Sequence, residues 1–144
     1  MIEGVKITAL RQIEDDRGKV MHMMRSDNEN FNQFGEIYFS TVNPGFVKGW
    51  HLHLEMEINY AVPIGSIKLV LYDDRQTSKS KGTVEEILLS PDKYCCVKIP
   101  PLIWNGFKGM GDTPALIANC SSIPHNPEEI LRISYLDPKV PYVW

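Results

Sequence analysis

Short segments that alternate apolar and polar residues, with glycine and proline between them, fill most of this sequence. Apolar residues at every second position are typical of half-buried β-strands. The 10 Gly and 10 Pro are spread along the 144 residues as turns and do not gather into a linker. The expected strands cover residues 6–10, 19–24, 36–42, 46–53, 57–63, 66–72, 84–89, 94–99, 103–107 and 114–120.

Helix signals are rare in this chain. Pro127 to Ile130, with Asn126 as an N-cap, predicts a single helical turn. Residues 57–63 and 66–72 are typical of a hairpin that turns at Gly65. Many short strands with almost no helix predict an all-β sandwich or barrel of jelly-roll type, whose mouth is a natural ligand pocket. The length predicts one domain, residues 1–144.

Composition excludes several classes of protein. The chain has 15 Lys and Arg against 18 Asp and Glu, a net charge of −3, so no basic block exists to bind a nucleic acid polymer. No apolar stretch approaches the roughly 20 residues that span a bilayer, so no membrane segment is expected. Cys95, Cys96 and Cys120 do not form a disulfide framework, because their number is odd and two are adjacent. We expect reduced thiols and a cytoplasmic location.

Polar side chains gather on one face of the strand expected over residues 46–53. His51 and His53 project to the same side, and Glu55 and Glu57 follow with the same parity. Burying these groups without partners would cost several kcal/mol, so the face must meet water, a ligand or a metal. A transition metal held by His51, His53 and Glu57, with Asn105 as a further ligand, fits the spacing, although a third histidine is missing.

The spacing of Gly45, His51, His53, Glu57 and Gly65 resembles the first cupin motif, and Asn105 stands where the second motif has a histidine. More narrowly, the chain resembles the dTDP-4-dehydrorhamnose 3,5-epimerase family over nearly its whole length. The matching motifs are Asp16-Arg17-Gly18, Gly45 to His51, Asp73-Asp74-Arg75, Ile99-Pro100-Pro101, Pro127-Glu128 and Asp137-Pro138 through Trp144.

This resemblance implies a cupin-type jelly roll, a homodimer and an epimerase or isomerase of a nucleotide-linked 4-keto-6-deoxy hexose that needs no cofactor. It makes His51 the general base and Asp137 the carboxylate that orients it. Lys48 matches an arginine that binds the charged part of the substrate. The other expected substrate-binding residues, some from these matches and some from their place near the site, are Glu36, Tyr38, Ser40, His53, Tyr60 and Asn105.

The chain also departs from the family pattern. The family's catalytic lysine falls near Ile58 or Asn59, and its acid tyrosine falls near Ile123 or Pro124, with His125 close by. These losses favour a reaction at a single carbon over double epimerisation. Two other functions remain open at this point: a metal-dependent cupin enzyme and a sugar-binding cupin without catalysis.

Overall fold

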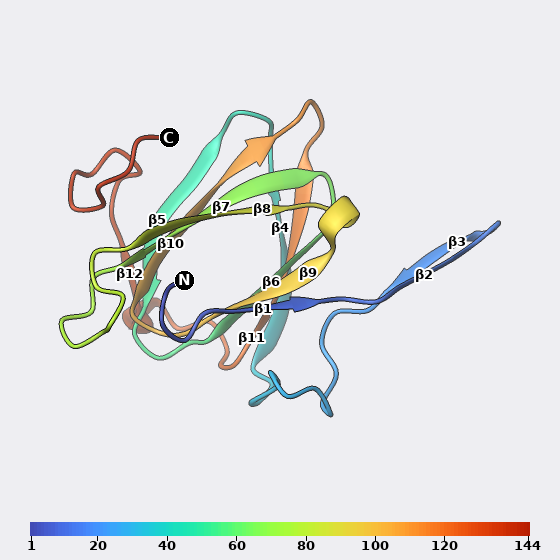
Figure 1. Ribbon diagram of the computed structural model, residues 1–144, viewed down its shortest axis with the longest axis horizontal. Coiled ribbons are helices and arrows are strands. Elements are labelled where there is room, and N and C mark those ends of the chain that lie inside the picture. The colour runs from blue at the N-terminus through green and yellow to red at the C-terminus, as the bar shows by residue number, and fades with distance from the viewer.

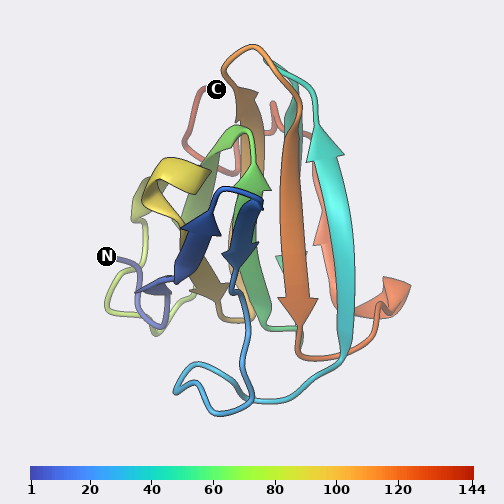
Figure 2. The ribbon, with the colours of Figure 1, turned by 90° about the vertical axis from the view of Figure 1, so that its right-hand side faces the viewer.

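The computed structural model describes residues 1–144 as two five-stranded antiparallel sheets that pack face to face (Figures 1 and 2). Sheet I has the order β1-β9-β6-β11-β4 and sheet II has the order β12-β5-β10-β7-β8. The strands are β1 (Lys6–Ala9), β2 (Gln12–Asp15), β3 (Gly18–Met21), β4 (Glu36–Val42), β5 (Val47–His53), β6 (Ile58–Ile64), β7 (Ser66–Asp73), β8 (Val84–Leu89), β9 (Cys95–Ile99), β10 (Ile103–Met110), β11 (Ala115–Ser121) and β12 (Ile130–Arg132).

The helical content is two short 3₁₀ turns, η1 (Pro91–Lys93) and η2 (Pro127–Glu129). The side chain of Asn126 accepts a hydrogen bond from the backbone N–H of Glu128, which confirms the single capped turn expected there. No helix has the length and apolar character that a membrane crossing requires. The all-β prediction is therefore confirmed. Strands β2 and β3 pair only with each other and form an arm that projects from the body (Figure 1).

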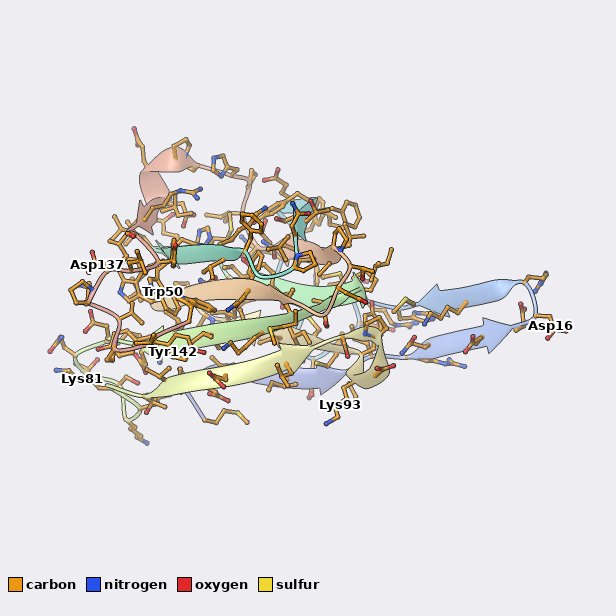
Figure 3. All side chains as sticks on the ribbon, turned by 90° about the horizontal axis from the view of Figure 1, so that it is seen from above. Asp16, Trp50, Lys81, Lys93, Asp137 and Tyr142 are labelled. Carbon is orange, nitrogen blue, oxygen red and sulfur yellow. The ribbon has the colours of Figure 1, made fainter.

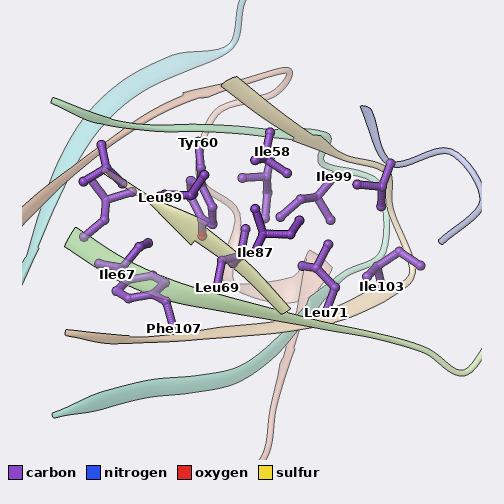
Figure 4. Packing of buried hydrophobic residues seen from close by; sticks show 14 of the residues in the cluster. Ile58, Tyr60, Ile67, Leu69, Leu71, Ile87, Leu89, Ile99, Ile103 and Phe107 are labelled. Atoms are coloured by element: carbon purple, nitrogen blue, oxygen red, sulfur yellow. The ribbon is translucent and has the colours of Figure 1, made fainter. Parts of the chain in front are cut away.

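The main core lies between the two sheets, where alternate residues of each strand point inward. It contains 18 buried residues, and Figure 4 shows the dense part around Ile67, Leu69 and Leu71 of β7. This aliphatic packing supplies most of the fold's stability, because each large side chain removed from water contributes roughly 1.5–3 kcal/mol.

A second apolar cluster covers the outer face of sheet II. It contains Trp50, Leu52, Val70, Trp104 and Val140, and Tyr142 and Trp144 pack against it. The rings of Trp50 and Trp144 lie 4.8 Å apart between centroids. The C-terminal segment, residues 133–144, therefore lies across the outside of sheet II.

The hairpin expected across Gly65 is wrong. Strand β6 pairs with β9 and β11 in sheet I, whereas β7 pairs with β8 and β10 in sheet II. Gly65, at φ 77°, turns the chain from one sheet to the other. A Cβ there would lie 2.6 Å from the Cα of Ala115, so only glycine fits. Two alternating segments joined by a short turn resemble a hairpin in sequence even when the strands enter different layers.

Candidate functional site

A cavity of about 490 Å³ opens between the two sheets, and polar side chains line much of it. This volume lies within the range of small-molecule sites, roughly 300–1,000 Å³. Sheet II contributes Lys48, His51, His53 and Arg132, and sheet I contributes Tyr38, Ser40, Tyr60 and Asn119. His125, from the loop after β11, also lines the cavity.

Cross-strand pairing places the polar side chains of sheet II next to one another. His51 of β5 pairs with Arg132 on β12 and with Asn105 on β10, so these three residues occupy neighbouring strands at one level. His53, two residues further along β5, pairs with Ile130 of β12. Directly opposed residues project to the same face of a sheet. Both histidines of β5 therefore face the cavity, as their parity predicted.

A β-bulge brings Lys48 onto the same face. His51 pairs with Asn105 and Lys48 pairs with Phe107, so the stretch of β5 is one residue longer than the stretch of β10 opposite it. Residues three apart on a regular strand would point to opposite sides, and the extra residue corrects this. The backbones of the two strands are close here, since a Cβ at Gly106 would lie 3.1 Å from the Cα of Gly49. The Lys48 Nζ reaches across to donate a hydrogen bond to Ser40 Oγ at 3.1 Å.

Strand pairing also positions the side chains that sheet I contributes to the cavity wall. Asn119 of β11 pairs with Tyr38 on β4 and with Tyr60 on β6. The Asn119 side-chain N–H donates to the Tyr38 hydroxyl at 2.9 Å, and its oxygen accepts from the backbone N–H of Asn59 at 3.1 Å. These two contacts fix the amide, so the wall offers two phenol groups in defined positions.

His51 and Tyr60 meet across the cavity, with the His51 Nε2 and the Tyr60 hydroxyl oxygen 3.4 Å apart. Burial, together with the charges of His53 and Arg132, lowers the pKa of His51 to about 3. Burial raises the pKa of Tyr60, with Tyr38 adding to the effect. At neutral pH the imidazole is neutral and the phenol keeps its proton. In the tautomer protonated at Nδ1, the Tyr60 hydroxyl donates to Nε2, and His51 then presents a lone pair to the cavity.

His53 is held by a buried carboxylate. Its Nδ1 contacts Glu129 Oε1, and both side chains are almost fully buried. The second oxygen of Glu129 accepts from the backbone N–H groups of Glu55 at 3.2 Å and Met56 at 3.1 Å. Burial alone would raise the pKa of Glu129, but the hydrogen bonds from His53 and these backbone groups hold it below its ordinary value. His53 is thus fixed 5.7 Å from His51 between ring centroids.

Comparison with known proteins identifies the family to which this fold and cavity belong. Residues 1–144 match the family model described as dTDP-4-dehydrorhamnose 3,5-epimerase. The chain belongs to this family. It is thus a dTDP-sugar epimerase-family enzyme, and the cupin-type jelly roll predicted from the motifs is confirmed.

Individual relatives agree with the family match. The spore coat polysaccharide biosynthesis protein SpsL of Bacillus subtilis is 31% identical over 146 residues, which cover 100% of this chain and 97% of SpsL. The probable low-salt glycan biosynthesis epimerase Agl13 of Haloferax volcanii is 35% identical over 120 residues, 82% of this chain and 77% of Agl13. The crystal structure of a dTDP sugar isomerase from Desulfovibrio desulfuricans G20 is 46% identical, with a TM-score of 0.97 over 99% of this chain and 92% of that one.

Asp137 does not lie where its match to a family motif predicted. Asp137 was expected behind His51, but it lies in the C-terminal segment with Tyr142, on the outside of sheet II (Figure 3). Its carboxylate accepts from the backbone N–H of Lys139 at 2.8 Å. His51 points into the cavity, while its neighbours Trp50 and Leu52 point to the outer cluster. The sheet therefore separates Asp137 from His51.

Two other expected substrate-binding residues are not among those that line the cavity. Asn105 projects to the same face of sheet II as His51 but is only 1% exposed. Its side-chain N–H donates to the His51 carbonyl at 3.2 Å, and its own oxygen has no partner. Glu36 accepts a hydrogen bond from the backbone N–H of His125 at 2.8 Å, so it supports a residue of the wall. The expected substrate-binding residues that do line the cavity are Tyr38, Ser40, Lys48, His53 and Tyr60, together with the expected base His51.

The metal site considered as an alternative is not assembled. Glu57 pairs with Lys98 at 2.9 Å, and His53 is engaged by Glu129. No three His, Cys, Asp or Glu side chains lie where they could hold one metal ion. Strand β5 ends at His53 and β6 begins at Ile58, so the alternation that seemed to place Glu57 beside the histidines does not continue through the intervening turn.

Three residues of this epimerase-family site were missed by sequence reasoning: Asn119, Glu129 and Arg132. Arg132 lies on a three-residue strand, too short to show a period, and it reaches the site only through pairing with β5. Glu129 was seen only as part of a helical turn. Asn119 lies within an expected strand, and a polar residue among apolar neighbours was the one signal that could have found it.

Proposed function

We propose that this chain epimerises or isomerises a nucleotide-linked 4-keto-6-deoxy hexose, and that His51 removes the proton next to the ketone. The observation that supports this most is the pairing of a neutral His51 on one wall with a protonated Tyr60 on the other. A positioned imidazole is a common general base, typically contributing 10²–10⁴-fold. The names of the family and its relatives support the substrate class and a role in polysaccharide or glycan biosynthesis.

The proposed reaction balances without a cofactor. His51 Nε2 takes the proton from the carbon beside the ketone, and the C–H electron pair forms the enolate double bond as the carbonyl pair moves to oxygen. Tyr60, on the opposite sheet, returns a proton to that carbon from the other face, which inverts it. Once the product has left and the two groups are again in contact, the imidazolium passes its proton to the phenolate. Both groups are thereby reset.

Lys48 is the proposed partner of the diphosphate. Its ammonium group has no carboxylate partner and contacts only Ser40 Oγ. An ammonium binds phosphate as a point charge, without the two-pronged geometry of the arginine that the family carries there. One local cation of this kind is compatible with a net charge of −3. Tyr38 and Asn119 then face the hydroxyl groups of the sugar.

We propose a reaction at a single carbon. The family's catalytic lysine falls near Ile58 or Asn59, which are 1% and 5% exposed, and neither side chain carries a charge. The site therefore has one base, His51, and one phenol in contact with it.

We further propose a single-domain homodimer in the cytoplasm. One apolar core shared by both sheets supports the single domain. Ile37 and Phe39 of the edge strand β4 are 52% and 66% exposed, an apolar surface of the kind that marks protein interfaces. The three unpaired cysteines fit a reducing compartment.

Proton exchange tests the proposed function. The protein is incubated with dTDP-4-keto-6-deoxyglucose in D₂O, and deuterium uptake and product configuration are followed by NMR. We expect exchange at one carbon in the wild type, and a loss of about 10²–10⁴-fold in His51→Asn. Tyr60→Phe should still exchange but should not invert the carbon. Full exchange by His51→Asn, or no exchange by the wild type, would exclude the proposal.

A further inference from the structure

An enolate in this cavity needs a positive charge close to the ketone oxygen. Removing a proton beside a ketone places a negative charge on that oxygen, and prearranged donors are often the largest contribution to such a step. The strand that faces His51 supplies phenols and amides but no cation, since Ile58 and Tyr60 are its inward residues. The charge must come from sheet II.

Two cationic side chains with no carboxylate partner line the cavity, Lys48 and Arg132. Lys48 is three residues from His51, beyond the bulge, and its Nζ extends to Ser40 of the other sheet. Arg132 stands directly opposite His51 on the neighbouring strand, so its side chain emerges beside the imidazole. By position, Lys48 is suited to a group at the far side of the sugar, and Arg132 to the reacting carbons.

The backbone that carries Arg132 is firmly held while its side chain remains free. The backbone N–H of Leu54 donates to the Glu129 carbonyl at 2.7 Å before the strand, and Trp50 and Ile133 exchange two backbone hydrogen bonds, of 3.0 and 3.1 Å, after it. Arg132 is an exposed residue, and its guanidinium makes no hydrogen bond or ion pair with the protein. Its charge acts on both reacting groups, since it lowers the pKa of His51 and opposes the rise in that of Tyr60.

We propose that Arg132 is a catalytic residue whose guanidinium binds the ketone oxygen and stabilises the enolate when His51 takes the proton. This rests on the proposed function above. The C–H pair becomes the C=C bond, the carbonyl pair moves to oxygen, and the guanidinium donates hydrogen bonds to that oxygen without losing its proton, because arginine stays charged at all working pH values. When a proton returns to carbon, the charge disappears and the ketone is released.

The test compares Arg132→Gln with Lys48→Gln, a matched removal of the other free cation. Deuterium exchange into dTDP-4-keto-6-deoxyglucose is measured at saturating sugar, and binding of dTDP alone is measured by calorimetry. We expect Arg132→Gln to lower the saturating exchange rate by about 10²–10³-fold, the usual cost of one oxyanion donor, with dTDP affinity changed less than about threefold. Lys48→Gln should instead weaken dTDP by about tenfold. Arg132→Lys should recover part of the rate.

Retained dTDP binding also shows that Arg132→Gln is folded. The proposal is overturned if this variant keeps the wild-type rate at saturation, or if it weakens dTDP as much as Lys48→Gln does, which would make Arg132 a phosphate ligand. These outcomes differ from failure of the proposed function, in which the wild type itself exchanges no proton.

Discussion

The two faces of strand β5 form two regions of opposite character. On the inner face, His51 and His53 border an open, polar cavity and are held by partners from other strands. On the outer face, Trp50 and Leu52 are buried in an apolar cluster that the C-terminal segment closes. Neighbouring residues thus serve chemistry and packing separately. If this division holds, substitutions on the outer face should change stability alone, and those on the inner face should affect protonation and activity.

The largest expected effect is on the outer face. Trp50→Ala should lower the free energy of unfolding by about 3–5 kcal/mol, because it empties a buried site between Trp144 and Tyr142. Urea unfolding followed by circular dichroism measures this. Leu88→Ala is the matched control, since Leu88 lies on the same outer face but is 67% exposed and should change stability by less than about 0.5 kcal/mol. Equal losses in the two variants would contradict the covered cluster.

On the inner face, Glu129→Gln should lower the free energy of unfolding by about 2–3 kcal/mol, somewhat less than Trp50→Ala. The carboxylate accepts hydrogen bonds from His53 and from two backbone N–H groups, and an amide cannot accept all of them. Glu128→Gln, next in the chain and exposed, is the control and should be nearly neutral. Unfolding in urea compares the two. A neutral result for Glu129→Gln would mean that the buried pair does not hold this wall.

The smallest expected effect is a dependence of the free energy of unfolding on pH. The pKa of His51 is about 3 in the folded protein, against roughly 6.5 when unfolded, so between these values only the unfolded chain takes up the proton. Stability therefore falls as pH decreases from 6.5, by about 1 kcal/mol per unit. Urea unfolding at pH 5.0 to 6.5 should show a shallower slope for His51→Asn than for the wild type. Glu129, whose pKa is lowered, titrates below this window.

Trp50→Ala sharpens the same comparison. It should shift the stability curve downward without changing its slope, because no titrating group is removed from the outer face. An unchanged slope in His51→Asn, or a changed one in Trp50→Ala, would show that the two faces are not independent.

The alternating pattern predicted the strands because solvent on one side and core on the other impose a period of two. Glu36–Val42 and Val84–Leu89 were predicted with the bounds observed. The local pattern could not predict which strands pair with one another. Asp137 matched a motif in sequence order, yet order says nothing of which face of a sheet a segment covers. Lys48 reached the cavity through a bulge, and Arg132 through a strand that only tertiary pairing creates.

The pairing of His53 with Glu129 has a consequence for synthesis. The two residues are 76 positions apart in the chain. At roughly 5–20 residues per second, a ribosome needs several seconds to make that stretch. During this interval the emerging β5 has neither the carboxylate that will hold His53 nor the strand that brings Arg132. A nascent chain arrested before residue 129 should therefore remain sensitive to protease along β5, and protection should appear only after β12 has emerged.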